Sequence, residues 1–225
     1  MSPPVDMADE FAAMWIPSQI LHRGAEAIVI SGYWFGEKAV LKIRNPRSYR
    51  HPDLDRRLIR QRLSAEVRVL TKLHSTNLSS PSLLDLDLDQ GWILLTNIDG
   101  GTLYDSLLCG SSGLEEIRRL GGVIREMHES GISHGDLTTH NVMIDHEGKI
   151  SLIDFGLSKI APEIEQLGLD LQVMHECLNA SHHEYEGAIE TLIEGYLYSS
   201  NDISPSGNEV VERFNSIRGR VRYHA

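Results

Sequence analysis

Apolar and polar residues alternate through much of the first hundred positions, which is the pattern of half-buried strands. The alternation predicts strands over residues 15–21, 27–33, 37–44, 83–88 and 92–95. Between the third and fourth of these, apolar residues recur every three to five positions from Leu58 to Leu73, which indicates one face of a long helix. We expect this helix to begin at Asp53 or Asp55 and to end near His74.

The second half of the chain follows a helical spacing. It predicts helices over residues 103–108, 114–130, 183–198 and 208–217, and a further helix near Asp170. The exception is a pair of short strands, residues 142–144 and 150–153, which a turn-like stretch separates. The sequence therefore predicts an α+β protein, with one long helix in a β-rich first half and a mainly helical second half.

The stretch around these two short strands carries the strongest chemical signal. It reads His134-Gly135-Asp136, then Asn141 after five residues, then Asp154-Phe155-Gly156. This spacing is typical of phosphoryl transfer, in which a catalytic loop, a hairpin and a metal-binding turn follow one another. Mg²⁺ prefers hard oxygen ligands, so we expect Asn141 and Asp154 to hold it. Asp136 is then available to orient or deprotonate the acceptor.

The complete motif set resembles that of the protein-kinase-like superfamily. The resemblance implies ATP and Mg²⁺ as cofactors and a two-lobed kinase-like fold. Its parts would be a β-rich N-lobe over residues 1–96, a hinge over 97–101 and a reduced helical C-lobe over 102–225. Gly135 stands where typical eukaryotic protein kinases carry an arginine, which binds a phosphate on the activation loop. We therefore expect that phosphorylation of such a loop does not control the activity of this site.

Lys42 ends the segment Ala39-Val40-Leu41-Lys42, which is similar to the kinase VAIK motif. A cation on an apolar strand costs free energy unless it is partnered, and ATP phosphates together with Glu66 would be suitable partners. Two alternatives remain open at this point. Lys42 could point to solvent from an edge strand, and Glu66 could be an exposed helical partner of Arg62.

The remaining nucleotide contacts are expected from their position in the chain. Gly24, Ala25 and Glu26 lie between the first two predicted strands, where a loop would cover the nucleotide. This loop has one glycine, which alone is a weak phosphate-binding signal. Backbone groups of Asn97, Ile98 and Asp99 are expected to bind adenine in the hinge.

Composition and charge exclude several classes of function. A hydrophobic fraction of 41% and a charged fraction of 24% are ordinary for a soluble globular protein. No apolar run approaches the ~20 residues of a membrane span, and the start does not resemble a signal peptide, so we expect a cytoplasmic protein with no membrane partner. Two cysteines, Cys109 and Cys177, cannot form a disulfide framework and lack zinc-site spacing.

The distribution of charge is uneven. The net charge of −11 argues against broad affinity for nucleic acid. Arginines nevertheless gather between Arg44 and Arg68, and again in the tail at positions 218, 220 and 222. These clusters are either solvated faces or local surfaces for RNA or an acidic partner.

Further stretches narrow the resemblance to one family. They are the single-glycine loop at Gly24, residues 49–55, residues 134–139, residues 154–158 and the tail Arg218-Gly219-Arg220. Together they are similar to the small atypical serine/threonine kinase and ATPase subunit of the KEOPS complex, over nearly the whole chain. The short C-lobe fits this family. The short stretch after Gly156 lacks the usual docking segment for extended peptide substrates.

The resemblance implies an ATP- and Mg²⁺-dependent ATPase and serine/threonine kinase. Such a protein binds and regulates the threonylcarbamoyl-transferase subunit of KEOPS, with which it is fused in some archaea, and supports threonylcarbamoyladenosine formation in tRNA. Contact with other KEOPS subunits, and with tRNA through the complex and the basic tail, is also implied. Three alternatives stay open: a small-molecule phosphotransferase of the aminoglycoside or choline kind, a noncatalytic nucleotide-binding scaffold, and a tRNA-binding module.

Overall fold

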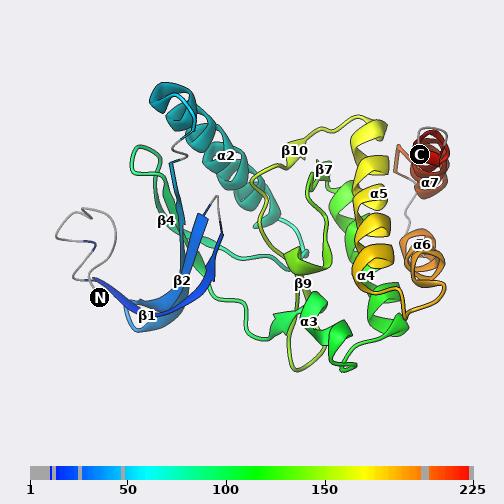
Figure 1. The fold of residues 1–225 in the computed structure, drawn as a ribbon, viewed down its shortest axis with the longest axis horizontal. Helices are drawn as coiled ribbons and strands as arrows, with labels where there is room; N and C mark the ends of the chain where they lie inside the picture. Colours follow the sequence, from blue (N-terminus) through cyan, green and yellow to red (C-terminus); the bar gives the residue numbers. More distant parts are fainter. Residues whose placement is uncertain (1–10, 12–13, 25–26, 47–48, 199–202, 223–225) are drawn as a thin grey trace. The chain divides into compact units, whose positions relative to one another are not determined.

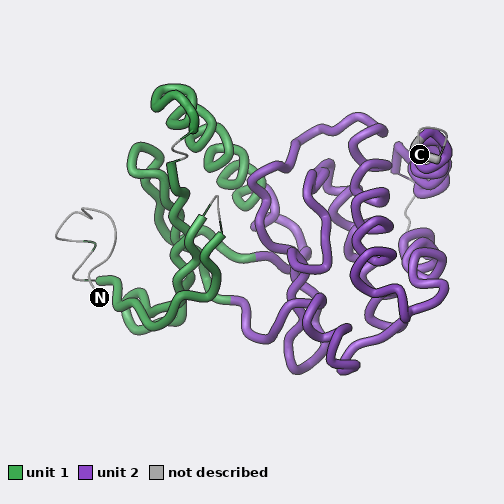
Figure 2. Tube along the Cα trace, viewed as in Figure 1, with its two compact units in different colours: residues 1–71, 81–97 green, residues 72–80, 98–225 purple. Residues whose placement is uncertain are grey.

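The computed structural model describes residues 11, 14–24, 27–46, 49–198 and 203–222 (Figure 1). The chain divides into two compact units (Figure 2). Unit 1 comprises residues 1–71 and 81–97, and unit 2 comprises residues 72–80 and 98–225. The expected α+β class is confirmed, because unit 1 holds a sheet and one long helix whereas unit 2 is mainly helical.

Unit 1 is built on a five-stranded antiparallel sheet with the strand order β1-β2-β3-β5-β4. The strands are β1 (Trp15–Arg23), β2 (Ala27–Trp34), β3 (Glu37–Arg44), β4 (Leu83–Asp87) and β5 (Trp92–Thr96). One face of the sheet forms an apolar core that includes Ile30, Leu41 and Leu94. All five strands were predicted, because each alternates or is continuously apolar over a strand's length.

The long helix of unit 1 is α2 (Pro52–Leu73). It begins at Pro52, slightly before the predicted aspartates, because proline suits a first helical position where its missing N–H is not needed. Leu63, Leu70 and Leu73 are fully buried, which confirms the predicted apolar face. The same spacing turns Glu66 toward the sheet, where it is 1% exposed.

Unit 2 holds five helices and three groups of short segments among its described residues. The helices are α3 (Leu103–Leu108), α4 (Leu114–Glu129), α5 (Ile164–Ser181), α6 (Ala188–Tyr198) and α7 (Gly207–Arg222). A small sheet joins β6 (Gly101–Thr102), β8 (Val142–Ile144) and β9 (Ile150–Leu152), and a second pairs β7 (Ile132–Ser133) with β10 (Lys159–Ile160). The 3₁₀ turn η1 (Thr139–Asn141) leads directly into β8.

Helix α6 packs against α4, and α7 packs against α5 (Figure 1). Two glycines set the first of these contacts. A Cβ atom on Gly195 would overlap the carbonyl oxygen of Arg118, and a Cβ atom on Gly121 would overlap that of Leu192. The backbones of α4 and α6 therefore touch without intervening side chains, which is the close approach that glycine permits.

Three predicted helix boundaries are wrong. Helix α5 begins at Ile164 and not near Asp170, because a capping box starts it early: the Glu163 N–H donates to Gln166 Oε1 at 2.7 Å. Helix α6 begins at Ala188 and not at His183, because the preceding turn needs Gly187 at a φ of +76°. Helix α7 continues to Arg222, beyond the predicted end at residue 217. Within the described ranges, no helix is long and apolar enough to cross a membrane.

Candidate active site

Asp136 and Asn141 are brought together by the loop between β7 and η1. The Asn141 amide nitrogen Nδ2 donates to the Asp136 backbone oxygen at 2.8 Å and to Asp136 Oδ2 at 3.2 Å. The Thr138 N–H also donates to the Asp136 carbonyl, at 3.0 Å. The loop therefore holds exposed Asp136 through both its backbone carbonyl and its carboxylate. Because Nδ2 of Asn141 is used in these contacts, its oxygen Oδ1 faces away from Asp136.

The β8–β9 hairpin links this loop to Asp154. The two segments pair as predicted, and the structure adds the register, in which Val142 lies opposite Leu152 and Ile144 opposite Ile150. The Ile153 N–H donates to the Asn141 carbonyl at 3.0 Å, so the residue before Asp154 is tied to the end of the catalytic loop. Asp154 itself has a φ of +60°, a left-handed conformation that is uncommon for residues other than glycine, although aspartate adopts it more often than most. Such strain is characteristic of functional sites.

His134 joins the catalytic loop to the Asp154 segment from inside the core. It is fully buried, and its ring nitrogen Nε2 lies 3.0 Å from the carbonyl oxygen of Ile153. Because a carbonyl only accepts, Nε2 carries the proton and Nδ1 accepts the Asp136 N–H, at 3.3 Å. Burial lowers the pKa of His134 below its ordinary value, which favours this neutral ring. His134 is thus a structural link between the two predicted motifs.

Asp170 is the residue of this region whose role the sequence did not reveal. It is 1% exposed on α5, and its Oδ2 accepts the His134 N–H at 2.7 Å while its Oδ1 accepts the Gly135 N–H at 2.8 Å. His128 Nε2 lies 3.2 Å from the same Oδ2. A carboxylate buried among the leucines of a helix is the available sequence signal, since such a group needs partners. Asp170 anchors the start of the catalytic loop.

Lys42 and Glu66 form a buried ion pair in unit 1. Lys42 Nζ lies 3.0 Å from Glu66 Oε1 and 3.3 Å from Oε2, and both side chains are more than nine-tenths buried. The alternatives of a solvent-facing Lys42 and an exposed Glu66 are therefore excluded. A second cation was not anticipated: Arg44 Nη2 lies 3.2 Å from Glu66 Oε2. The Glu66 carboxylate therefore forms ion pairs with two buried cations.

The structure describes only part of the predicted nucleotide-covering loop, and it divides the predicted hinge between the two units. The Gly24 N–H donates to the Ala27 carbonyl at 3.0 Å, which closes a turn between β1 and β2. Ala25 and Glu26 lie outside the described residues. The Asn97 N–H donates to the Lys38 carbonyl at 3.3 Å within unit 1. Ile98 and Asp99 belong to unit 2, so the division between units falls directly after Asn97.

The donor set of unit 2 fits a magnesium ion. The described residues contain no group of three or more His, Cys, Asp or Glu side chains able to hold a metal. Mg²⁺ characteristically takes only one or two protein oxygens and completes its shell with water and substrate phosphates. The oxygens of Asn141 and Asp154, on adjoining segments of one hairpin, meet that modest requirement.

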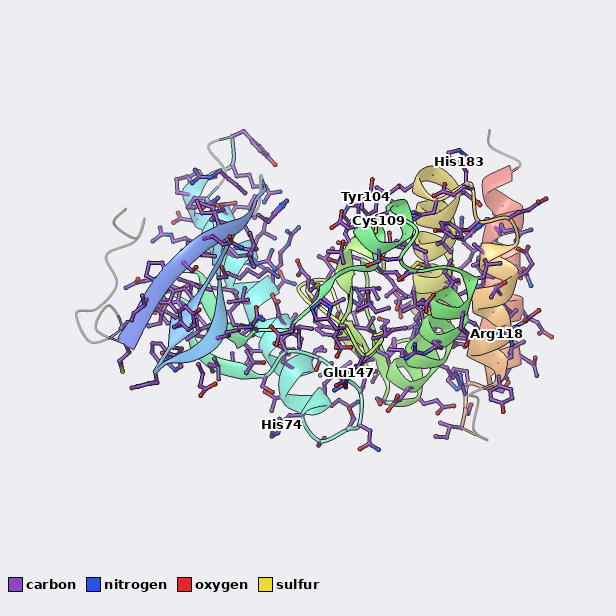
Figure 3. All side chains as sticks on the ribbon, turned by 90° about the horizontal axis from the view of Figure 1, so that it is seen from below. His74, Tyr104, Cys109, Arg118, Glu147 and His183 are labelled. Atoms are coloured by element: carbon purple, nitrogen blue, oxygen red, sulfur yellow. The ribbon has the colours of Figure 1, made fainter. Side chains whose placement is uncertain are left out.

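An aromatic cluster supports the far side of the catalytic loop. Tyr104 of α3, labelled in Figure 3, stacks on His140 with ring centroids 3.8 Å apart. Buried His182 lies 3.0 Å from the Thr139 hydroxyl, which also lies 3.3 Å from Cys177 Sγ. His182 packs under η1 while its neighbour His183 is exposed, so the adjacent histidines do not form a metal site. Cys109 and Cys177 are both free thiols.

The ion pair of unit 1 and the catalytic loop of unit 2 are features of a kinase-like protein. A model of the protein kinase domain matches residues 18–179. The mouse EKC/KEOPS complex subunit Tp53rkb is 32% identical over 91% of this chain and 86% of its own length. The KEOPS complex subunit Bud32 of Pyrococcus abyssi is 32% identical over 91% of this chain and 96% of its own length. The chain therefore belongs to the protein kinase family and, within it, to the family of Bud32 and Tp53rkb.

A longer group of relatives matches as well. A probable bifunctional tRNA threonylcarbamoyladenosine biosynthesis protein of Methanothermobacter thermautotrophicus is 33% identical over 84% of this chain. Only 35% of that relative is covered, and proteins of the same description from two other archaea are covered to 37% and 35%. The chain thus spans about a third of the length of these relatives.

Proposed function

We propose that this chain is an ATP- and Mg²⁺-dependent atypical kinase and ATPase of a KEOPS complex. In this role it supports threonylcarbamoyladenosine modification of tRNA by binding and regulating the threonylcarbamoyl-transferase subunit. The observation that carries the proposal is the hydrogen-bonded Asp136–Asn141 pair, tied through Ile153 to a strained Asp154. The buried Lys42–Glu66 pair supports it independently.

Each predicted residue has a role in the proposed chemistry. Asp136 would accept a hydrogen bond from the nucleophile's hydroxyl and orient it for in-line attack on the γ-phosphorus of ATP. It would receive the hydroxyl proton as the new bond to phosphorus forms and the bond from that phosphorus to the departing ADP oxygen breaks. Asn141 and Asp154 hold Mg²⁺, which supplies positive charge to the phosphate oxygens. Lys42, oriented by Glu66, binds ATP phosphates. Gly24, Ala25 and Glu26 would cover the nucleotide, and the backbone of Asn97, Ile98 and Asp99 would bind adenine.

The nucleophile is water or a nearby hydroxyl rather than an extended peptide. Only residues 157–163 separate Gly156 from α5, and β10 within this stretch pairs with β7. No segment long enough to bind a peptide strand remains there. The proposed lobes, residues 1–96 and 102–225 around a hinge at 97–101, would serve hydrolysis of ATP coupled to a partner.

The names of the relatives support the proposed partners. Two of them are KEOPS subunits, and the archaeal relatives are described as bifunctional in threonylcarbamoyladenosine biosynthesis. We therefore propose the transferase subunit, fused or separate, as the direct partner, with other KEOPS subunits and tRNA reached through the complex. The arginines of the basic tail, of which Arg220 is exposed, would contribute to the contact with tRNA.

The proposal is tested by measuring Mg²⁺-dependent ATP hydrolysis by the full chain, alone and with a transferase subunit and tRNA. The Asp136→Asn variant should lose roughly 10²–10⁴-fold in kcat while its affinity for nucleotide changes little. Asp89→Asn, an exposed aspartate of unit 1, is the matched control and should retain full turnover. Hydrolysis that rises with partner and tRNA, and falls in Asp136→Asn alone, is the expected result.

Other outcomes would redirect the assignment. Turnover stimulated by amino sugars or choline, and indifferent to partner and tRNA, would identify a small-molecule phosphotransferase. Nucleotide binding without turnover in any mixture would leave a scaffold. Turnover unchanged in Asp136→Asn would remove that residue from the mechanism.

A further inference from the structure

Behind the catalytic loop, helix α6 contributes a hydrogen bond that the kinase motifs do not include. The hydroxyl of Tyr196 lies 2.8 Å from Nδ1 of His128 on α4. Tyr196 is fully buried and His128 is 4% exposed, so water does not compete for either group. Burial raises the pKa of Tyr196 to about 12, so the hydroxyl keeps its proton at neutral pH.

For a His128 ring that carries one proton, Asp170 sets the direction of this hydrogen bond. Both Asp170 oxygens already accept backbone N–H groups, from His134 and Gly135, as an ionised carboxylate does. His128 Nε2, 3.2 Å from Oδ2, must therefore be the donor in that contact. A neutral ring with its proton on Nε2 leaves Nδ1 as an acceptor. Tyr196 then donates its hydroxyl proton to Nδ1.

Arg125 also contacts Tyr196. The Arg125 guanidinium carbon lies 5.6 Å from the centroid of the Tyr196 ring. The guanidinium itself is fixed by Glu129 Oε1 at 2.7 Å and by the carbonyls of Pro205 and Ile203 at 3.1 and 3.4 Å. Arg125 is 1% exposed, so its orientation is determined by these buried contacts and not by solvent.

We infer that Tyr196 is a positioning residue for the catalytic loop. It holds His128 in the tautomer that donates to Asp170, and Asp170 in turn holds the backbone N–H groups of His134 and Gly135 directly before Asp136. Without the tyrosine hydroxyl, His128 is no longer restrained to one tautomer or ring orientation. The hydrogen bond from His128 Nε2 to the Asp170 carboxylate is then weakened. The inference rests on the proposed function for its effect on turnover, and its structural part stands apart from it.

The experiment compares Tyr196→Phe with Tyr185→Phe in the full chain. Tyr185 is the matched control, because its hydroxyl lies 2.8 and 3.0 Å from the carbonyl oxygens of Leu107 and Ser112 and makes no hydrogen bond to His128 or Asp170. Amide hydrogen exchange at His134 and Gly135 is measured first, by NMR. In Tyr196→Phe we expect exchange at both amides to rise about tenfold, which corresponds to one lost hydrogen bond. Tyr185→Phe should leave both rates at the wild-type value.

Steady-state kinetics supply the second readout. Tyr196→Phe should lower kcat by roughly tenfold to a hundredfold with the KM for MgATP unchanged, because the bound nucleotide is not contacted. Tyr185→Phe should change neither constant. If the wild-type chain hydrolyses no ATP in any mixture, the proposed function fails, and the exchange rates alone decide the inference.

A measurement on the unmodified protein guards against a variant that does not fold. The ¹⁵N shifts of the His128 ring report its tautomer directly, and a proton on Nε2 is expected. A proton on Nδ1 would overturn the inference. Exchange at His134 and Gly135 that is unchanged in Tyr196→Phe, or that rises equally in Tyr185→Phe, would overturn it as well.

Discussion

The carbonyl oxygen of Leu157 fills the space in which a side chain on Gly135 would begin. A Cβ atom built on Gly135 would overlap this oxygen and would lie 2.9 Å from the carbonyl carbon. Gly135 also has a φ of +80°, in the region that favours glycine. The backbone therefore accounts for the glycine that stands where typical protein kinases carry arginine.

Gly135→Ala should destabilise the protein by roughly 1–3 kcal/mol and lower turnover, because the loop that carries Asp136 has to move. Urea unfolding and ATP hydrolysis measure the two effects. Gly101→Ala is the control for stability, since a Cβ atom there meets nothing within 4 Å and the backbone is not left-handed. If Gly135→Ala unfolds at the same urea concentration as the wild type, the loop is not held as described.

Glu66→Gln should cost more stability than Lys42→Met. The glutamine removes the carboxylate that two buried cations share, and breaking such a buried pair costs roughly 3–5 kcal/mol. Lys42→Met keeps the Glu66–Arg44 pair and fills the space with an apolar chain of similar length, so its cost should be smaller. The free energy of unfolding in urea ranks the two variants. The reverse order would mean that Arg44 contributes little to the site.

Ala161→Gly should stabilise the protein, although most substitutions do not. Ala161 has a φ of +53° and its N–H donates to the Gly131 carbonyl at 3.0 Å, so the strained conformation is retained for a hydrogen bond. Glycine relieves this strain, with an expected gain of about 0.5–1 kcal/mol. Ala65→Gly, inside α2, is the opposite case and should lose about 1 kcal/mol. Thermal unfolding distinguishes the two signs.

Stability should fall in alkali through Tyr196. Its pKa of about 12 in the folded protein lies above the ordinary tyrosine value of about 10, so folding favours the protonated form. This contribution is complete below pH 10 and is lost as the pH rises from 10 to 12, by roughly 2–3 kcal/mol. Urea unfolding across that range should show the wild type losing stability relative to Tyr196→Phe. Parallel curves for the two proteins would contradict the raised pKa.

Much of the fold followed from the sequence because its signals are local. Strand alternation predicted the strands, and the apolar spacing predicted α2. The burial of Glu66 was one of two alternatives, and the structure decided it through the contact with Lys42. The segment Ala39-Val40-Leu41-Lys42 could be identified because a lysine among buried aliphatic residues demands a partner. The strands and the helix depend only on periods of two and 3.6 residues, whereas Lys42 was recognised from the similarity of its segment to a kinase motif.

The parts that were missed depend on residues far apart in the chain. Asp170 reaches His134 across 36 residues, and Tyr196 reaches His128 across 68. The one local signal is Asp170 itself, a carboxylate among the leucines of α5. Nothing in the local pattern indicates which residues it contacts, or distinguishes Tyr196 from any other tyrosine. The early start of α5 is a different error, since the capping pair at 163 and 166 was present in the sequence and was outweighed by the apolar run after Asp170.

The contact between α4 and α6 has a consequence for how the sequence can vary. Gly121 and Gly195 carry no chemistry, lie in no motif and sit in the middle of helices, where glycine is a poor choice. Each nevertheless faces a backbone that cannot yield to a larger residue. In a library of all single substitutions, these two positions should therefore tolerate change as poorly as Asp136. A survey that ranks residues by intolerance alone would assign this helix–helix contact to the active site.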